Sequence, residues 1–300
     1  MLRDGAKTGS GVMGDCSRDE LIRRMVGREV IKRTDKQDHS RDEELLRVEG
    51  LSFRNPANPA DFLARDIRFA LRRGEVLGVY GLMGSGRTEV LEAIFGLHPK
   101  FVTGEIRVEG KPVRIRSIGD AIGAGIGLVP EDRKSQGLVL IMDIIKNTSL
   151  ARLANSDALS TGGMIRSKKE EVLCDRYMKE LEVKLSDPRN EVQTLSGGNQ
   201  QKVVIAKWLA TQPKILLLDE PTRGVDMGAK GEIYALIQKL AEAGMGIVVV
   251  SSELPEIQAL SDNVLVFSES RLTGRLTRAQ ATEENIMKAA LAEKEDQKTA

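Results

Sequence analysis

Two short strings, one rich in glycine and one ending in acids, limit the possible folds of this 300-residue chain more than its composition does. Residues 195–202 read Leu-Ser-Gly-Gly-Asn-Gln-Gln-Lys, and residues 215–222 read Ile-Leu-Leu-Leu-Asp-Glu-Pro-Thr. A serine followed by two glycines favours a helix start that other groups can approach closely. An apolar strand ending in adjacent carboxylates places both acids at the carboxyl edge of a parallel sheet, where ligands bind. Together the strings predict an α/β fold that closes around a ligand.

The hydrophobic pattern of the rest of the chain agrees with an α/β fold. Three segments alternate like half-exposed strands of a small antiparallel sheet, namely residues 46–49, 67–71 and 105–109. Three continuous apolar runs predict parallel strands buried on both faces, namely residues 76–80, 215–218 and 246–250. Helical patterns cover residues 168–182, 198–210 and 229–243. We expect a mostly parallel core sheet, a small antiparallel β-subdomain and, over residues 140–195, a helical subdomain.

Composition excludes several classes of protein. The 45 basic and 44 acidic residues leave a net charge of +1, which does not indicate a nucleic-acid or lipid surface. No apolar run approaches the roughly 20 residues that span a bilayer, and the N-terminus does not resemble a signal peptide. Cys16 and Cys174 lie far apart without metal-ligand spacing, so we expect reduced thiols. These features fit a cytoplasmic protein, or the cytoplasmic part of something larger.

A phosphate-binding loop is predicted at residues 81–88, between a buried strand and a helical run. Its glycines let backbone N–H groups wrap phosphates at a helix N-terminus, and its threonine would bind Mg²⁺. An arginine stands where the P-loop pattern has lysine, and its planar fork cannot act as a compact ammonium, so efficient hydrolysis is in doubt. The alternative is a structural glycine turn. The predicted cofactor-binding residues here are Gly81, Gly84, Ser85, Gly86, Arg87 and Thr88.

Two further groups of residues carry chemistry. Asp219 would hold Mg²⁺, and Glu220 would orient or deprotonate an attacking water. The alternative for both is a solvated strand end. Ser196 fits an N-cap, and Gly197 and Gly198 allow close approach of a ligand. A local helix cap is the alternative, but the full eight-residue string is too long for that to compete.

These motifs resemble those of ABC-type ATPases, whose signature and Walker B sequences match the two opening strings. The chain is most similar to the second ATP-binding half of ribose/galactose-type bacterial sugar importers. That half carries a glycine-rich loop with arginine, followed by VPEDRK, LSGGNQQK, DEPTRGVD and VSSE. All five appear here, and the resemblance covers residues 45–291.

The resemblance implies roles for residues that the pattern alone leaves open. Residues 196–198 would reach across an interface to the γ-phosphate on a partner's P-loop. Glu131 stands at the Q-loop and would sense Mg²⁺ and contact the membrane subunit, although a plain charged turn is the alternative. Asp226 matches the D-loop aspartate, and Ser252 takes the switch position, where a histidine is usual. Phe53 would stack on adenine or belong to the core.

By resemblance, the protein is the C-terminal half of a tandem ATPase, peripheral on the cytoplasmic face of the membrane, that couples ATP binding and hydrolysis to motion of a sugar permease. The implied cofactors are ATP and Mg²⁺. The implied partners are membrane permease subunits, a first ATPase half or a second copy, and indirectly a periplasmic sugar-binding protein, with no nucleic acid. The alternative is a non-hydrolysing regulatory module from a truncated tandem ATPase.

The resemblance also implies two unequal sites. Arg87 and Ser252 both weaken the site that this chain's own P-loop builds, whereas the signature that serves a partner's P-loop is intact. The hypothesis is that two ATP molecules lie at the interface. The site using this signature would hydrolyse efficiently, and the site using Arg87 would hydrolyse slowly.

The two ends of the chain resemble each other. Residues 1–9 and 17–26 align without a gap on residues 266–274 and 282–291, at a constant offset of 265 residues. Both copies predict a turn, a Ser/Thr cap, an acidic first turn and an amphipathic helix. Identities are few, and an accidental alignment is the alternative. The predicted organisation is residues 1–30 as the tail of a preceding ATPase half, 31–44 as a linker, 45–293 as the nucleotide-binding domain and 294–300 as a disordered tail.

Overall fold

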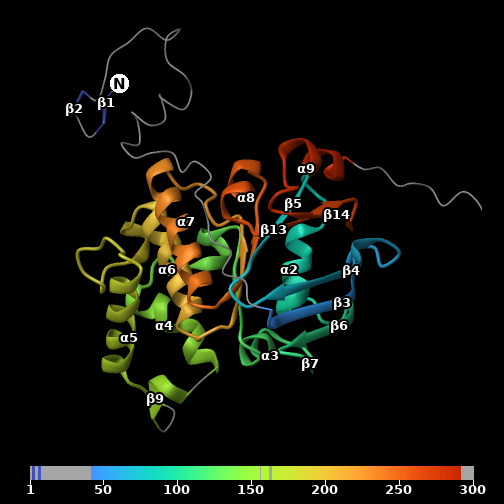
Figure 1. Ribbon diagram of the computed structural model, residues 1–300. Helices are drawn as coiled ribbons and strands as arrows, with labels where there is room; N and C mark the ends of the chain where they lie inside the picture. Colours follow the sequence, from blue (N-terminus) through green and yellow to red (C-terminus); the bar gives the residue numbers. More distant parts are fainter. Residues whose placement is uncertain (1, 4–5, 8–41, 156, 162–163, 292–300) are drawn as a thin grey trace, which may run out of the picture.

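Two sheets and a group of helices make up the chain (Figure 1). The structure is a computed structural model that describes residues 2–3, 6–7, 42–155, 157–161 and 164–291. The sheets occupy one side of the view in Figure 1, and the helices α4, α5 and α6 occupy the other. This arrangement confirms the predicted fold class of a parallel core, an antiparallel β-subdomain and a helical subdomain.

The larger sheet has six strands in the order β14-β13-β5-β12-β11-β8, and only β14 runs antiparallel to its neighbour. Every residue of β5, β8, β11 and β12 is buried, as expected of parallel strands covered on both faces. The strands are β5 (Val76–Gly81), β8 (Ile126–Val129), β11 (Ile215–Asp219), β12 (Gly246–Val250), β13 (Asn263–Ser268) and β14 (Arg271–Thr277). The sequence analysis predicts β5, β11 and β12 but not the other three.

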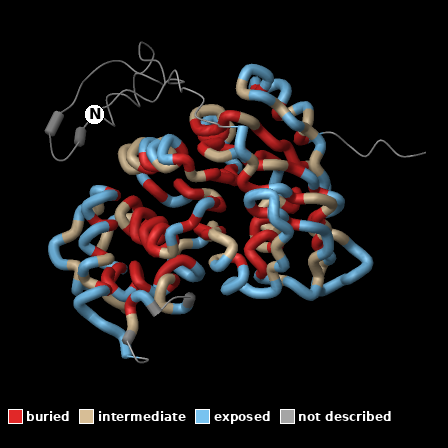
Figure 2. The backbone as a smooth tube through the Cα atoms, turned by 60° about the horizontal axis from the view of Figure 1, so that its bottom comes forward, coloured by how far each residue is buried: buried red, intermediate tan, exposed pale blue. Residues whose placement is uncertain are grey.

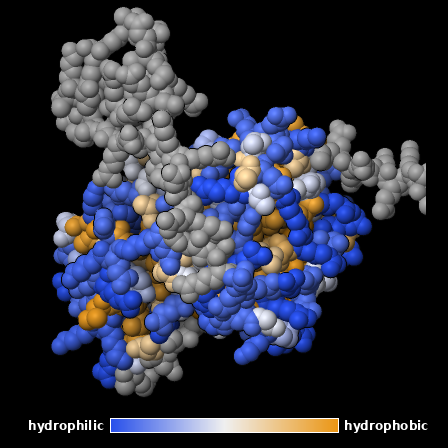
Figure 3. Space-filling model, in the orientation of Figure 1, coloured by the Kyte–Doolittle hydropathy of each residue, from blue (hydrophilic) through white to orange (hydrophobic). Residues whose placement is uncertain are grey.

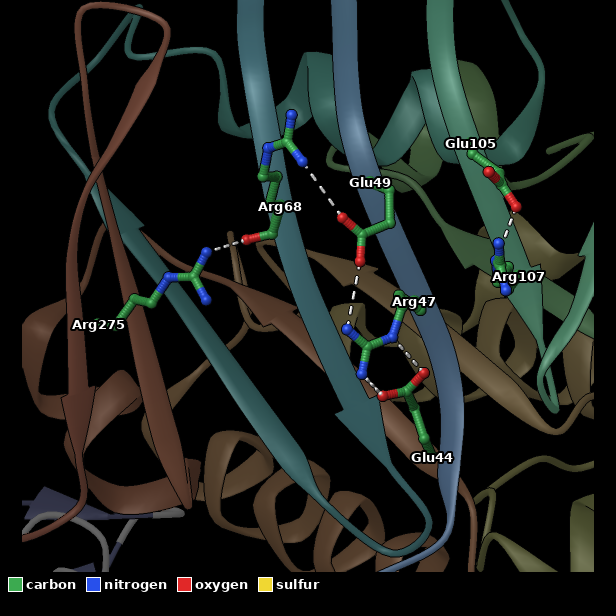
Figure 4. A network of polar contacts seen from close by, with 7 residues as sticks. All are labelled: Glu44, Arg47, Glu49, Arg68, Glu105, Arg107 and Arg275. Carbon is green, nitrogen blue, oxygen red and sulfur yellow. Dashed lines mark hydrogen bonds and ion pairs between the residues drawn. The ribbon is translucent and has the colours of Figure 1, made fainter.

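The smaller sheet is antiparallel, in the order β4-β3-β6-β7. Its strands are β3 (Glu44–Arg54), β4 (Phe62–Arg72), β6 (Val102–Val108) and β7 (Lys111–Val113). Arginine–carboxylate pairs cover its outer face (Figure 4). Arg47 pairs with Glu44 and Glu49, and Arg107 pairs with Glu105. Because such exposed pairs add about 0–1 kcal/mol each, they mainly keep this face in water.

One arginine connects the two sheets at their edges. Arg275 of β14 donates a hydrogen bond of 2.5 Å to the carbonyl oxygen of Arg68 on β4 (Figure 4). The edge strand β4 of the antiparallel sheet is thereby tied to the edge strand β14 of the parallel sheet.

The helices divide into those that flank the sheets and those that form a separate lobe. The former are α2 (Arg87–Phe95), α3 (Ile118–Gly123), α7 (Met227–Glu242), α8 (Leu254–Leu260) and α9 (Glu283–Ala290). The lobe contains α4 (Ile144–Asn155), α5 (Ser167–Glu180) and α6 (Gly197–Leu209). It also carries a small hairpin of β9 (Ser160–Thr161) and β10 (Met164–Ile165), which the sequence analysis did not predict.

A continuous hydrophobic core runs through both parts, as the buried stretches in Figure 2 show. Cys174 is a free thiol in this core, and burial raises its pKa to about 11, which disfavours the reactive thiolate, whereas Cys16 lies outside the described residues. On the face drawn in Figure 3 hydrophilic residues predominate, with smaller hydrophobic patches between them. No helix in the described part of the chain has the length and apolar character needed to cross a membrane.

The chain ends bear on the predicted repeat. The structure does not describe most of residues 1–43, which include the segment 17–26 predicted to match α9, and it does not describe the predicted tail at 294–300. The strand β3 begins at Glu44, the last residue of the predicted linker. The later copy forms as predicted, because the Thr282 hydroxyl accepts the backbone N–H of Asn285 at the start of α9. The strands β1 (Leu2–Arg3) and β2 (Ala6–Lys7) pair in the register that β13 and β14 show 265 residues later. The domain boundaries themselves remain a prediction.

Candidate nucleotide site

The loop between β5 and α2 has the backbone of a phosphate-binding turn. Gly84 and Gly86 take left-handed conformations, with φ of 76° and 93°, and Gly86 stands at the N-cap of α2. A Cβ at Gly86 would lie 2.2 Å from the carbonyl oxygen of Leu63 on β4, so only glycine fits. The loop thus turns its backbone toward the start of α2, where N–H groups and the helix dipole favour an anion.

A pocket of about 450 Å³ lies over this loop and gathers residues from three other segments. It brings together the P-loop, the strand ends after β11 and β12, and the turn after β8. Its lining comprises Met83, Gly84, Ser85, Gly86, Arg87, Thr88, Glu89, Glu131, Glu220, Arg223, Ser252 and Glu253. Of the predicted site residues, Gly81 lies below the loop in β5, where a Cβ would meet the Ser85 hydroxyl at 2.4 Å.

Three buried polar atoms in or beside the pocket have no hydrogen-bond partner among the described residues. They are the Ser85 hydroxyl, Nη1 of Arg87 and Oδ1 of Asp219. Buried polar atoms without a partner are rare and costly, and a ligand is one thing that explains them. A hydroxyl and a guanidinium suit phosphate oxygens, and a carboxylate oxygen suits a hard cation. The residues present therefore fit a nucleotide bound with Mg²⁺.

Asp219 ends β11 and is only 3% exposed. Burial raises the pKa of its carboxyl to about 6, although the Thr88 hydroxyl and Arg87 act in the opposite direction. The three predicted metal ligands, Thr88, Glu131 and Asp219, all line a second cavity of about 350 Å³ that adjoins the first. Among the described residues no three acidic, histidine or cysteine side chains cluster as a metal site on their own. A bound Mg²⁺ would need phosphate or water ligands as well.

Glu220 and Ser252, the two predicted catalytic residues, are in contact. Oε1 of Glu220 accepts the backbone N–H of Ser252 at 2.8 Å, and Oε2 accepts the Ser252 hydroxyl at 3.2 Å. Nη1 of Arg87 lies 3.7 Å from the same Oε1. Glu220 itself takes the left-handed conformation, with φ of 45°, and such strain in a non-glycine residue is typical of functional sites. The carboxylate is thus aimed at the pocket and fixed there.

The sequence analysis missed a buried carboxyl that contacts the loops after β11 and β12. Glu256 of α8 is 1% exposed and accepts the hydroxyl of Thr222 at 2.9 Å. Burial raises the pKa of Glu256, against the effect of hydrogen bonds from Ser251 and Thr222. It therefore ties the loop after Glu220 to the end of β12. An acid in the first turn of a helix is too common a pattern to have revealed this.

The Q-loop candidate has a partner in the structure. Glu131 forms an ion pair with Arg223, and both side chains line the pocket. Its carboxylate is thus beside the predicted Mg²⁺ position but is neutralised by an arginine. Its role as a magnesium sensor remains a prediction.

The signature turn lies away from this pocket, since residues 196–198 are not among those lining it. Ser196 occupies the N-cap position of α6, but its hydroxyl accepts from Nδ2 of Asn199 and makes no capping bond to the backbone. The predicted N-cap position of Ser196 is therefore confirmed, but its side chain makes no capping hydrogen bond. A Cβ at Gly198 would lie 2.5 Å from the Cβ of Ala229 in α7, so this glycine is already needed for helix packing.

Two other predicted positions are structural within this chain. Asp226 is the N-cap of α7 and accepts the backbone N–H of Ala229 at 3.0 Å. Phe53 is 1% exposed and stacks on His98 with ring centroids 5.0 Å apart. It therefore belongs to the core, and the adenine-stacking alternative is wrong.

Comparison with known families agrees with this geometry. The family model described as "ABC transporter" matches residues 64–223, which include the loop, the signature and both strand-end acids. The chain belongs to the ABC transporter family. Curated relatives are 46–47% identical to it over the aligned residues.

Two of these relatives are sugar import proteins. The ribose import ATP-binding protein RbsA of Rhodopirellula baltica is 47% identical over 291 residues, which are 97% of this chain and 56% of that protein. The xylose import ATP-binding protein XylG of Moorella thermoacetica is 46% identical over 97% of this chain and 57% of its own length. The chain thus spans little more than half the length of the curated relatives it matches.

Solved structures share the ABC transporter cassette fold. MJ1267, an ATP-binding cassette of an ABC transporter, superposes with a TM-score of 0.70 at 16% identity and covers 83% of this chain and 99% of its own. The protein cbiO1 of Clostridium perfringens, part of the transporter complex cbiONQ, gives a TM-score of 0.65 at 22% identity, over 82% and 94% of the two chains. At these identities the likeness concerns the fold.

Proposed function

We propose that this chain is the ATP-binding and ATP-hydrolysing half of a sugar-import ABC transporter. The observation that carries the proposal is the set of buried atoms on Ser85, Arg87 and Asp219 that lack a hydrogen-bond partner among the described residues and that match phosphate oxygens and a divalent cation. The names of the relatives, which are ribose and xylose import proteins, support a pentose or a similar sugar as the cargo.

The chain's own residues would act on the bound nucleotide in separate roles. Backbone N–H groups of the glycine loop, Ser85 and Arg87 would hold the phosphates, and Thr88 and Asp219 would hold Mg²⁺, with Glu131 beside it. Mg²⁺ neutralises charge on the phosphates when it is bound. Glu220 would accept a proton from the attacking water or orient it, and Ser252 keeps that carboxylate in place through two hydrogen bonds.

The signature and Asp226 would serve a second site. They lie outside the pocket of this chain, which supports a composite arrangement with a first ATPase half or a second copy. The site using Arg87 would be the slower one. Closure on ATP would move membrane permease subunits at the cytoplasmic face, with a periplasmic sugar-binding protein acting indirectly. The matching register of the β1–β2 and β13–β14 hairpins supports a preceding half.

Calorimetric titration of the chain with Mg–ATP tests this proposal. The wild type should bind, and Arg87→Gln should bind about tenfold or more weakly, because it loses a charge-assisted bond to phosphate. Arg176→Gln, which removes an exposed helix-surface arginine paired with Glu180, is the matched control and should bind like the wild type. Equal affinity of the wild type and Arg87→Gln would contradict the assignment of the pocket. Hydrolysis by the chain together with a first half would then separate an ATPase from a regulatory module.

A further inference from the structure

Arg133 lies behind the wall of the pocket, and its side chain joins three segments of the chain. Nη1 donates to the carbonyl oxygen of Arg223 at 2.7 Å, and Nη2 donates to that of Gly224 at 3.0 Å. Nε donates to Oε1 of Gln200, in α6, at 3.4 Å. A planar guanidinium can serve several acceptors in a fixed geometry, which an ammonium cannot. Arg133 does not line the pocket, so it would not touch a ligand there.

The signature turn packs directly on this guanidinium. A Cβ at Gly197 would lie 2.8 Å from Nη2 of Arg133 and 3.1 Å from the carbonyl oxygen of Gly224. Gln200, which accepts from Arg133, also donates from Nε2 to the carbonyl oxygen of Leu195 at 3.0 Å. Both sides of the turn at residues 196–198 are therefore linked to Arg133.

The other end of the link lies inside the pocket. Arg223 offers its side chain to Glu131 in the pocket and its carbonyl oxygen to Arg133 behind it. Glu131 in turn lies only two residues before Arg133. A ligand that draws either Glu131 or Arg223 toward it would displace the carbonyl oxygens that Arg133 holds.

The backbone around Arg133 is fixed, so that such a displacement would pass on to α6. The carboxylate of Asp132 accepts the backbone N–H groups of Lys134 and Ser135, which closes the turn that begins at Arg133. At the far end of this turn, Nζ of the buried Lys207 in α6 donates to the carbonyl oxygen of Gly137 at 2.5 Å. The turn and α6 are thus joined at two points and would move together.

We propose that Arg133 is a positioning residue that transmits the occupancy of this chain's own pocket to the signature turn at residues 196–198. The proposal rests on the proposed function, since it needs a nucleotide in the pocket. It gives the Arg87 site a regulatory use: a nucleotide that is hydrolysed slowly there would set the geometry that this chain presents to the partner's nucleotide. Coupling of this kind is a difference in free energy between two sites and can be measured as such.

Hydrogen exchange of the full chain, with and without Mg²⁺ and a slowly hydrolysed ATP analogue, tests the link. In the wild type the analogue should change the exchange of amides in residues 196–202 and 223–229. In Arg133→Gln the affinity for the analogue should stay within about threefold, the basal exchange at both segments should rise by about tenfold, and the response of residues 196–202 should disappear. Arg133→Lys keeps the positive charge but not the planar guanidinium, so it disturbs the fold less than Arg133→Gln does. It should also abolish the response of residues 196–202 to the analogue.

The matched control is Arg107→Gln, which removes an exposed arginine paired with Glu105 on the outer sheet face and should leave the response intact. A general loss of packing would lower stability without selectively removing the response to nucleotide. If both Arg133 variants bind the analogue and keep the wild-type response at residues 196–202, the proposal is overturned. If the wild type binds no analogue, the proposed function fails and the coupling fails with it, so the two failures are told apart by the binding measurement.

Discussion

The nucleotide pocket and the signature turn belong to one chain but differ in how completely their polar groups are paired. At the pocket, Ser85, Arg87 and Asp219 each keep a buried atom without a hydrogen-bond partner among the described residues. At the signature turn, Ser196 accepts from Asn199, and Gln200 bonds both to the chain before it and to Arg133. The first region is left to be completed by a ligand, and the turn of the second is already held by the protein, although Nε2 of Gln201 farther along α6 lacks a hydrogen-bond partner among the described residues.

This difference teaches what each region has to do. Unpaired polar atoms lower stability, so they persist where a ligand regularly supplies the partner. A turn that must dock on a nucleotide held by another domain gains instead from being ordered beforehand, because ordering it on docking would cost affinity. The pocket would therefore bind and respond to its own ligand, whereas the signature would present an already ordered turn whose position Arg133 adjusts.

The largest test of this comparison is Gly198→Asp in the assembled pair of ATPase halves. The new side chain would collide with Ala229 of α7 and displace the signature turn from the position in which it would dock on the partner's nucleotide. ATP turnover, measured as phosphate release, should fall by about 10²–10³-fold, the effect of losing preorganised stabilisation of the transition state. Affinity of the isolated chain for Mg–ATP should change by less than about twofold.

Glu220→Gln in the same pair of ATPase halves tests the other site, because Glu220 belongs to the site that is proposed to hydrolyse ATP slowly. It should reduce turnover of the pair by less than about tenfold, whereas loss of a general base at the efficient site would cost about 10²–10⁴. A larger loss from Glu220→Gln than from Gly198→Asp would reverse the assignment of the two sites.

Asp219→Asn should stabilise the ligand-free chain at neutral pH. Because burial raises the pKa of Asp219 from 3.8 to about 6, the folded chain holds a proton between about pH 4 and 6 that the unfolded chain releases. The contribution of Asp219 to stability is therefore lost as the pH rises through this range. At pH 7.5 the variant should be more stable by up to about 3 kcal/mol, with little difference near pH 4.

Urea unfolding at both pH values measures this effect, and adding Mg–ATP supplies its control. The wild type should then gain stability that the variant does not, since binding to the folded state stabilises it. A variant less stable than the wild type at pH 7.5 without ligand would show that Asp219 is structurally required and is not waiting for a cation.

The variants Gly86→Ala and Gly84→Ala test, by their affinity for Mg–ATP, two positions within the phosphate-binding loop. Both glycines have positive φ, but a Cβ at Gly86 meets the carbonyl oxygen of Leu63, whereas nothing lies within 4 Å of one at Gly84. The affinity for Mg–ATP should fall by about tenfold or more in Gly86→Ala, and by clearly less in Gly84→Ala, where only the backbone strain acts. Equal losses would mean that the contact with β4 does not shape the loop.

Local strings predicted most of the site, and contacts between distant segments account for what they missed. The strand, loop and helix around residues 76–95 are neighbours in sequence, so their pattern was readable. Arg133 meets carbonyl groups 90 residues away, and Glu256 meets a hydroxyl 34 residues away, and neither pairing leaves a periodic signal. The strand β8 has only four residues, is interrupted by Gly127 and is followed by Pro130, so its apolar run is too short to stand out as a strand.

Ser252→Ala should have the smallest effect and distinguishes support from chemistry at the slower site. The variant removes the hydroxyl bond of 3.2 Å to Glu220 but keeps the backbone N–H bond of 2.8 Å, so the carboxylate should stay close to its position. The residual ATP turnover of the isolated chain should fall by about threefold, less than a full hydrogen bond to a charged group would cost. Glu220→Gln gives the floor of the same assay. If the turnover of Ser252→Ala is as low as that of Glu220→Gln, the Ser252 hydroxyl takes part in the reaction. The pocket of this chain would then depend less on added ligands than its comparison with the signature turn implies.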